Sequence, residues 1–235
     1  MKKIFSLKNI VLALNCAVIL AIFIMNFFYQ RDDFNFTLKC VCSVCFACLG
    51  LINLGYAIYT KQTNMKFYII MAIGLVFAMV GDIVINSNFI GGAASFAIGH
   101  IFFIVAYCML KNIKWLEFVI SSVVFVAAGA FLVFCPLLEF GSVALKCVCV
   151  GYALIISLMF GKAVSNFVYE RNVFYALLAV GSFLFVFSDL MLVLNNFMGT
   201  VNWAGYACMA TYYPALCLFA LSMFISTLKK EKTAQ

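Results

Sequence analysis

The sequence has few charged residues, only two prolines and one histidine. Asp, Glu, Lys and Arg make up 10% of its 235 residues, whereas 67% of the residues are hydrophobic. No polar stretch is long enough to form a domain outside a membrane, which excludes an ordinary soluble protein. No P-loop, GxGxxG, HExxH or GxSxG motif occurs in a suitable context either. The chain is therefore predicted to be an all-α polytopic membrane protein whose chemistry takes place among its helices.

Long apolar runs divide the chain into membrane spans. A bilayer core is crossed by about 20 residues of helix, and eight runs meet that length. They cover residues 10–29, 37–59, 67–86, 93–110, 116–135, 142–161, 173–194 and 203–227. The first run is longer than the core of a signal peptide and lacks a cleavage site, so we interpret it as a helix. We expect residues 1–235 to form a single integral membrane domain.

The basic residues are distributed unequally between the two sides of the predicted spans. Twelve of the fifteen Lys and Arg residues share a side with the N-terminus. This bias predicts that both termini are cytoplasmic, and we expect the plasma (inner) membrane as the host. The net charge of +7 thus orients the protein and does not indicate binding of nucleic acid.

Eleven cysteines could suggest a disulfide framework or a metal site. Four of them, Cys40, Cys42, Cys45 and Cys48, lie in one apolar run and point around most of a helix, so they cannot converge on one metal. Buried thiols behave as small hydrophobic groups. We expect neither a metal nor a cofactor.

Two apolar runs carry an acid at the same place. Residues 67–85 contain Asp82 and residues 174–193 contain Asp189, and five residue types recur between the runs at a shift of 107 positions. The same shift places the segment LKCVC at 38–42 onto 145–149. We predict an internal duplication, with parallel four-helix repeats at about 1–112 and 113–235 and a pseudo-two-fold axis along the membrane normal.

The two acids are the principal candidates for chemistry. A carboxylate within a spanning helix costs roughly 2.5 kcal/mol or more, so it needs a function or a partner. We expect Asp82 and Asp189 to face each other in the outer third of the membrane. Two carboxylates at close range cannot both ionise cheaply, so one keeps its proton and the site contains an acid and a base. Alternatively, each acid only caps or pairs with a neighbouring helix.

Further polar residues are predicted at about the same depth. His100 shares a helix face with Tyr107, and a histidine there is either a hydrogen-bonded core residue or part of the site. Lys39 and Lys146 are related by the shift of 107, and each either reaches the interface or pairs with an acid or a phosphate. The remaining candidates for substrate contacts are Tyr152, Ser188, Tyr212 and Tyr213.

The motifs that contain these residues resemble the YhhN family of lysoplasmalogenase-like membrane proteins. The matching pieces are Gly81-Asp82-Ile83-Val84, Phe96-x3-His100-x6-Tyr107, Phe185-x2-Ser188-Asp189 and Thr211-Tyr212-Tyr213, with Tyr152, Met159 and Lys39 fitting more loosely. The chain departs from the family where a glutamine commonly follows the tyrosines, because it has Pro214-Ala215-Leu216 there.

The resemblance implies about eight helices and hydrolysis of the vinyl ether bond of lysoplasmalogens, with Asp82 and Asp189 as the catalytic pair. The products would be a fatty aldehyde and a glycerophospho-alcohol. The expected partners are thus a lysophospholipid substrate and membrane lipids. A proton-coupled transporter and a lipid-binding scaffold without turnover are the alternatives. The head group, the chain preference, the oligomeric state and the division of roles between the two acids are left open.

Overall fold

The computed structural model describes residues 2–31, 35–199 and 202–233, and all of its regular structure in these ranges is α-helical. The helices are α1 Lys2–Arg31, α2 Phe36–Tyr59, α3 Met65–Val84, α4 Phe89–Leu110, α5 Trp115–Phe134, α6 Val143–Glu170, α7 Val173–Phe197 and α8 Asn202–Thr233. Each is long and apolar enough to cross a membrane. The prediction of an all-α fold with eight spans is confirmed.

Some helices extend beyond the predicted apolar runs because their polar ends have partners. Helix α6 continues past residue 161 to Glu170, and in this extension Lys162 forms an ion pair with Glu117 at 2.8 Å. Helix α4 begins four residues earlier than predicted, since the Asn88 side chain accepts a hydrogen bond from the Gly91 N–H at 2.9 Å and caps the helix. A hydropathy pattern contains no information on either contact, so it could not predict these longer helices.

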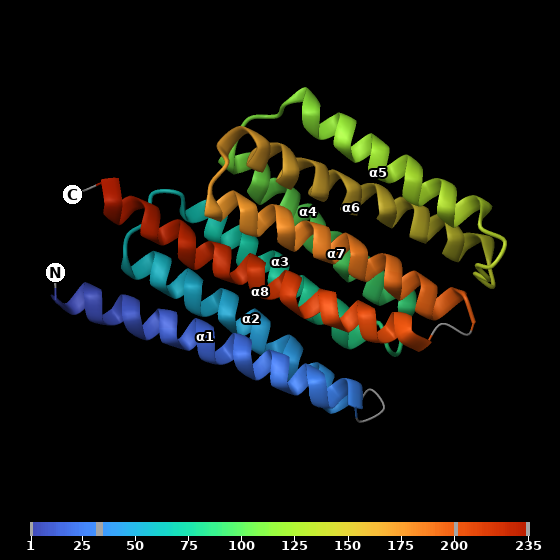
Figure 1. Ribbon diagram of the computed structural model, residues 1–235, viewed down its shortest axis with the longest axis horizontal. Coiled ribbons are helices and arrows are strands. Elements are labelled where there is room, and N and C mark those ends of the chain that lie inside the picture. Colours follow the sequence, from blue (N-terminus) through green and yellow to red (C-terminus); the bar gives the residue numbers. More distant parts are fainter. Residues whose placement is uncertain (1, 32–34, 200–201, 234–235) are drawn as a thin grey trace.

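The helices run up and down, so that α1 begins and α8 ends at the same end of the bundle (Figure 1). The opposite end, where α1 meets α2 and α7 meets α8, is called the distal end below. The charge bias predicts that the distal end faces outward. That orientation, the host membrane and the division into two four-helix repeats stay predictions.

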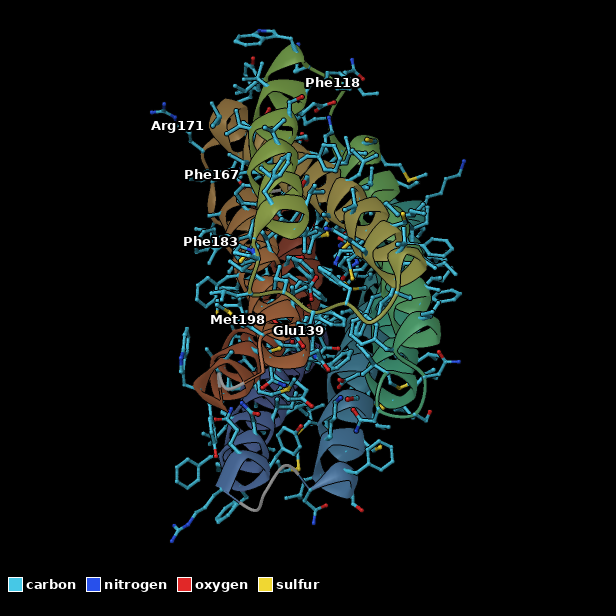
Figure 2. The ribbon with its side chains drawn as sticks, turned by 90° about the vertical axis from the view of Figure 1, so that its right-hand side faces the viewer. Phe118, Glu139, Phe167, Arg171, Phe183 and Met198 are labelled. Carbon is cyan, nitrogen blue, oxygen red and sulfur yellow. The ribbon has the colours of Figure 1, made fainter. Side chains whose placement is uncertain are left out.

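Helix α8 lies at the centre of the bundle and α5 at its edge. Helix α8 packs against α1, α2, α3 and α7, and it has the most buried span. Within the described residues, α5 packs against α6 and against no other helix. Figure 2 looks along the bundle and shows α5 at one edge and α1 at the other. This arrangement leaves one flank of α5 free to border a cavity.

The spacing of Gly74, Gly81 and Asp82 in the sequence places them on one face of α3 and predicts close packing there. In the structure these glycines allow α3 and α4 to approach closely. A Cβ atom added at Gly74 would lie 2.5 Å from the ring of Phe103, which is itself fully buried. A Cβ atom added at Gly81, beside Asp82, would lie 2.9 Å from the ring of Phe96. The acid therefore lies on a packed face of α3.

Amide side chains connect the edge helix α1 to the centre. Asn15 on α1 and Asn53 on α2 exchange hydrogen bonds of 2.8 and 2.9 Å, and Asn53 also donates to the Ala220 carbonyl on α8. All three polar groups are buried among apolar side chains. Interhelical bonds of this kind stabilise membrane bundles by about 0.6 kcal/mol each, and by up to about 1.7 kcal/mol.

The close approach of α3 and α4 makes a testable prediction. We expect Gly74→Ala to lower the free energy of unfolding by about 1–3 kcal/mol, because the added methyl group has no space against Phe103. Gly151→Ala on α6 is the matched control, since nothing lies within 4 Å of its Cβ position. Thermal unfolding of both variants in detergent measures the difference. Equal midpoints would contradict the packing described here.

Candidate active site

Asp82 lies at the distal end of α3 and contacts residues from two other helices. The residue is 2% exposed, and its Oδ1 atom is 3.1 Å from the Nζ of Lys39 on α2. The hydroxyl of Ser43 on α2 donates to Oδ2, and so does the hydroxyl of Tyr213 on α8, at 3.3 Å. Lys39 and Ser43 are four residues apart and therefore share a face of α2. One carboxylate thus joins α2, α3 and α8.

Lys39 is held away from the bulk solvent. It is 4% exposed, and its Nζ donates to the Oδ1 of Asn86 at 2.8 Å in addition to its ion pair with Asp82. The structure thus shows Lys39 paired with an acid and not extended to the membrane interface. A buried charge is tolerable when it has an opposite charge and hydrogen bonds around it, and both conditions hold for this pair.

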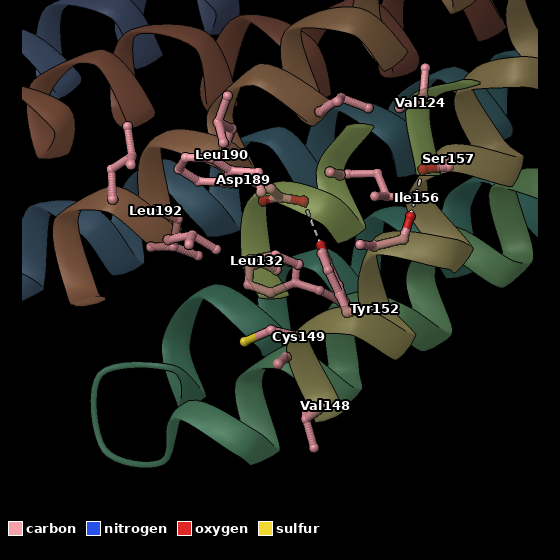
Figure 3. A pocket seen from close by; sticks show the side chains of 18 of the residues that line it. Val124, Leu132, Val148, Cys149, Tyr152, Ile156, Ser157, Asp189, Leu190 and Leu192 are labelled. Carbon is pink, nitrogen blue, oxygen red and sulfur yellow. Dashed lines mark hydrogen bonds between the residues drawn. The ribbon is translucent and has the colours of Figure 1, made fainter. Parts of the chain in front are cut away.

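Asp189 lies on α7 in a different environment. It is partly buried, and its Oδ2 accepts a hydrogen bond of 2.6 Å from the hydroxyl of Tyr152 on α6, drawn as a dashed line in Figure 3. Among the described residues no lysine, arginine or histidine lies within 4.0 Å of its carboxylate. Lys146, the counterpart of Lys39, instead donates to the Val133 carbonyl at 2.9 Å. Lys146 is therefore not brought to the acids.

Both carboxylates border one small cavity whose wall combines polar and apolar side chains. Its volume is about 20 Å³, and its wall also contains Lys39, Ser188 and Tyr212. A cavity of this size accommodates about one water molecule, and the polar groups of its wall are suitable hydrogen-bond partners for it. Asp82 and Asp189 therefore border the same cavity, whereas their facing each other in the outer third of the membrane stays a prediction.

A much larger apolar chamber lies on the other side of Asp189. It has a volume of about 860 Å³ and lies between α4, α5, α6 and α7. Asp189 is the only charged residue in its wall, and Tyr152 lies beside it (Figure 3). Asp189 borders both spaces, whereas Asp82 borders only the small one. This volume falls within the usual range for pockets that bind small molecules.

His100 is buried among aromatic side chains, which include the Tyr152 that donates to Asp189. Its Nδ1 is 2.6 Å from the Phe96 carbonyl, and a carbonyl can only accept, so Nδ1 carries the proton. The Nε2 atom is consequently an acceptor, and among the described residues it has no hydrogen-bond partner. The ring packs 4.6 Å from Phe185 and 5.5 Å from Tyr152, centroid to centroid.

The other predicted residues are divided between the site and the core. Ser188 and Tyr212 border the small cavity, although Ser188 donates to the Cys208 carbonyl at 3.1 Å. Tyr107 borders neither cavity, and its hydroxyl lies 3.5 Å from the Ser182 hydroxyl. Tyr107 is therefore not brought to the acids.

Sequence reasoning missed Ser43 and did not assign Asn86 a role at the site. The spacing of four residues between Lys39 and Ser43 is the signal that could have identified Ser43. Among the described residues no group of three or more His, Cys, Asp or Glu side chains is placed to hold a metal. All eleven cysteines are free thiols.

The ion pair makes a testable prediction about stability. Lys39→Met leaves the Asp82 carboxylate buried without a cation, which we expect to cost about 3 kcal/mol or more of unfolding free energy. Asp82→Asn in the same chain removes the unpaired charge, so the double variant should regain part of the loss. Lys146→Met is the matched control, because that amine donates to the Val133 carbonyl and lies 6.0 Å from the ring of Phe140 but has no carboxylate partner among the described residues.

Thermal unfolding of the four variants measures the coupling between Lys39 and Asp82. Strictly additive effects of the two substitutions, or equal effects of Lys39→Met and Lys146→Met, would contradict the buried ion pair.

Comparison with known proteins agrees with this geometry at the level of the family. No curated protein and no solved structure matches the chain. The sequence model described as the YhhN family matches residues 34–223, a range that contains every residue of the site described above. The protein belongs to the YhhN family.

Proposed function

We propose that the protein is an intramembrane hydrolase that cleaves the vinyl ether bond of a lysoplasmalogen-type lipid. The observation that carries this proposal is that two carboxylates share one small cavity but differ in their partners. Asp82 has Lys39 beside it, whereas Asp189 has no cation and faces an apolar chamber. An acid and a base at one site are what hydrolysis through a cationic intermediate requires.

The different partners assign different roles to the two acids. The positive charge of Lys39 compensates an ionised Asp82, so Asp82 is the base. Asp189 borders the apolar chamber without a charge partner, and a neutral carboxyl group is far cheaper to keep there than an anion. Asp189 therefore holds the proton and is the acid. The hydroxyl of Tyr152 orients its carboxyl group through their hydrogen bond.

The reaction then proceeds in three balanced steps. Asp189 transfers its proton to the outer carbon of the vinyl ether double bond, which leaves an oxocarbenium cation at the carbon bonded to oxygen. A water in the small cavity adds to that carbon while Asp82 takes its proton. The resulting hemiacetal breaks into a fatty aldehyde and a glycerophospho-alcohol: its hydroxyl proton passes to Asp189, while Asp82 gives the proton that it took from water to the leaving oxygen. The net reaction consumes one water molecule.

Neighbouring groups support the charged intermediate. The rings of Phe96, Phe185 and Tyr212 pack around this region, with Phe185 and Tyr212 5.4 Å apart and Phe96 and Tyr212 5.9 Å apart. Aromatic faces attract a cation, more strongly where water is excluded.

The proposal predicts the behaviour of both aspartates. Purified wild-type protein should release aldehyde from a lysoplasmalogen, whereas Asp82→Asn and Asp189→Asn should each lose at least about 100-fold in rate, the usual contribution of an acid or base. Tyr152→Phe should lose less, since it removes only the orienting bond. Lys146→Met is the control that should keep full activity.

Size-exclusion chromatography of each variant distinguishes lost catalysis from lost folding. Well-folded wild-type protein that releases no aldehyde from any of several head-group classes would contradict the proposal. Uptake of an unchanged substrate into proteoliposomes would then favour the transporter.

A further inference from the structure

The chamber beside Asp189 presents an almost wholly apolar surface. Its few polar groups are engaged with each other: the Tyr152 hydroxyl with Asp189, and the Ser157 hydroxyl with the Ala153 carbonyl at 2.6 Å (Figure 3). The wall extends from Val123 to Leu132 on α5, which is about 13 Å at a rise of 1.5 Å per residue. A surface with so few hydrogen-bonding groups fits a hydrocarbon ligand.

The distal end of the chamber is closed by the segment between α5 and α6. The Glu139 N–H donates to the Phe197 carbonyl at 2.8 Å, and the ring of Phe140 lies 4.7 Å from that of Phe197. Phe89 completes the cluster at 5.2 Å from Phe197. Figure 2 shows Glu139 beside Met198 at this end. A polar head group therefore does not enter along the bundle axis.

The flank of the chamber between α5 and α7 is open. Val123 on α5, Leu190 on α7 and Trp203 on α8 all border the chamber, yet they are 65%, 39% and 60% exposed. Within the described residues, α5 packs against neither α4 nor α7. In a membrane, this flank faces the lipid hydrocarbon and not water.

We propose that the chamber binds one unbranched aliphatic chain of a lipid, which enters sideways from the bilayer between α5 and α7. The head end of the chain then lies at Asp189. This placement rests on the proposed function, whereas the binding of the chain itself does not depend on that function. Because lipid tails are as apolar as the wall, transfer from the bilayer gains little hydrophobic energy. Binding therefore depends on how well the chain fits the wall of the chamber.

Photo-crosslinking tests this proposal without requiring turnover. The probe is a lysophosphatidylcholine with a diazirine in its ester-linked chain, which has no vinyl ether bond to hydrolyse. We expect crosslinks on the chamber walls of α5, α6 and α7. An excess of unlabelled lysophosphatidylcholine should remove them.

Two alanines on α5 provide a matched pair of variants. Ala128 lines the chamber and Ala130 does not, being exposed on the same helix. Ala128→Phe fills the chamber and should reduce chamber crosslinking several-fold, whereas Ala130→Phe should leave it unchanged. Val193→Phe, from the α7 wall, replaces Ala128→Phe if that variant fails to fold.

The possible outcomes separate this proposal from the proposed function. Crosslinks confined to the outer faces of the bundle, or equal labelling of both alanine variants, would each overturn it. Chamber labelling in a protein that releases no aldehyde would uphold the chain site and reject the hydrolase. Aldehyde release without chamber labelling would uphold the hydrolase and reject the chain site.

Discussion

The structure depends on the buried ion pair between Lys39 and Asp82. A single charge at this position would be costly in a membrane, and the pair is retained because each partner also has hydrogen bonds, from Ser43 and Tyr213 to the acid and from the lysine to Asn86. These contacts fix α2, α3 and α8 relative to one another. They also provide one wall of the small cavity in which the second acid is found.

The second acid owes its different environment to residues that differ between the two segments related by the shift of 107 positions. The position 107 residues after Ser43 is Val150, and Lys146 is directed to the end of α5, so Asp189 receives neither a hydroxyl nor an amine from the matching face of α6. Tyr152 is its one hydrogen-bond partner from that helix. Two acids that are equivalent in the sequence thus become chemically different. Asp189 also faces the chamber, which is open because α5 packs against neither α4 nor α7 within the described residues.

The sequence was sufficient for those features that depend on local pattern. Apolar runs of bilayer length predicted all eight helices, the glycines beside Asp82 predicted a packed face, and the cost of buried charge predicted that the acids have partners. The features that it could not supply depend on contacts between distant segments. Lys39 pairs with Asp82, whereas Lys146 donates to the Val133 carbonyl. This difference follows from how α2 and α6 pack against their neighbours. The closure of the chamber by Phe140 and Phe197 likewise involves residues that carry no motif.

The central claim is that the two aspartates carry different protonation states, and infrared difference spectroscopy tests it most directly. A protonated carboxyl group absorbs as a carbonyl stretch that shifts in heavy water, whereas an ionised one does not. Wild-type protein should show such a band near neutral pH. Asp189→Asn should remove the band, and Asp82→Asn should leave it in place. Loss of the band in Asp82→Asn, with retention in Asp189→Asn, would contradict the assignment of acid and base.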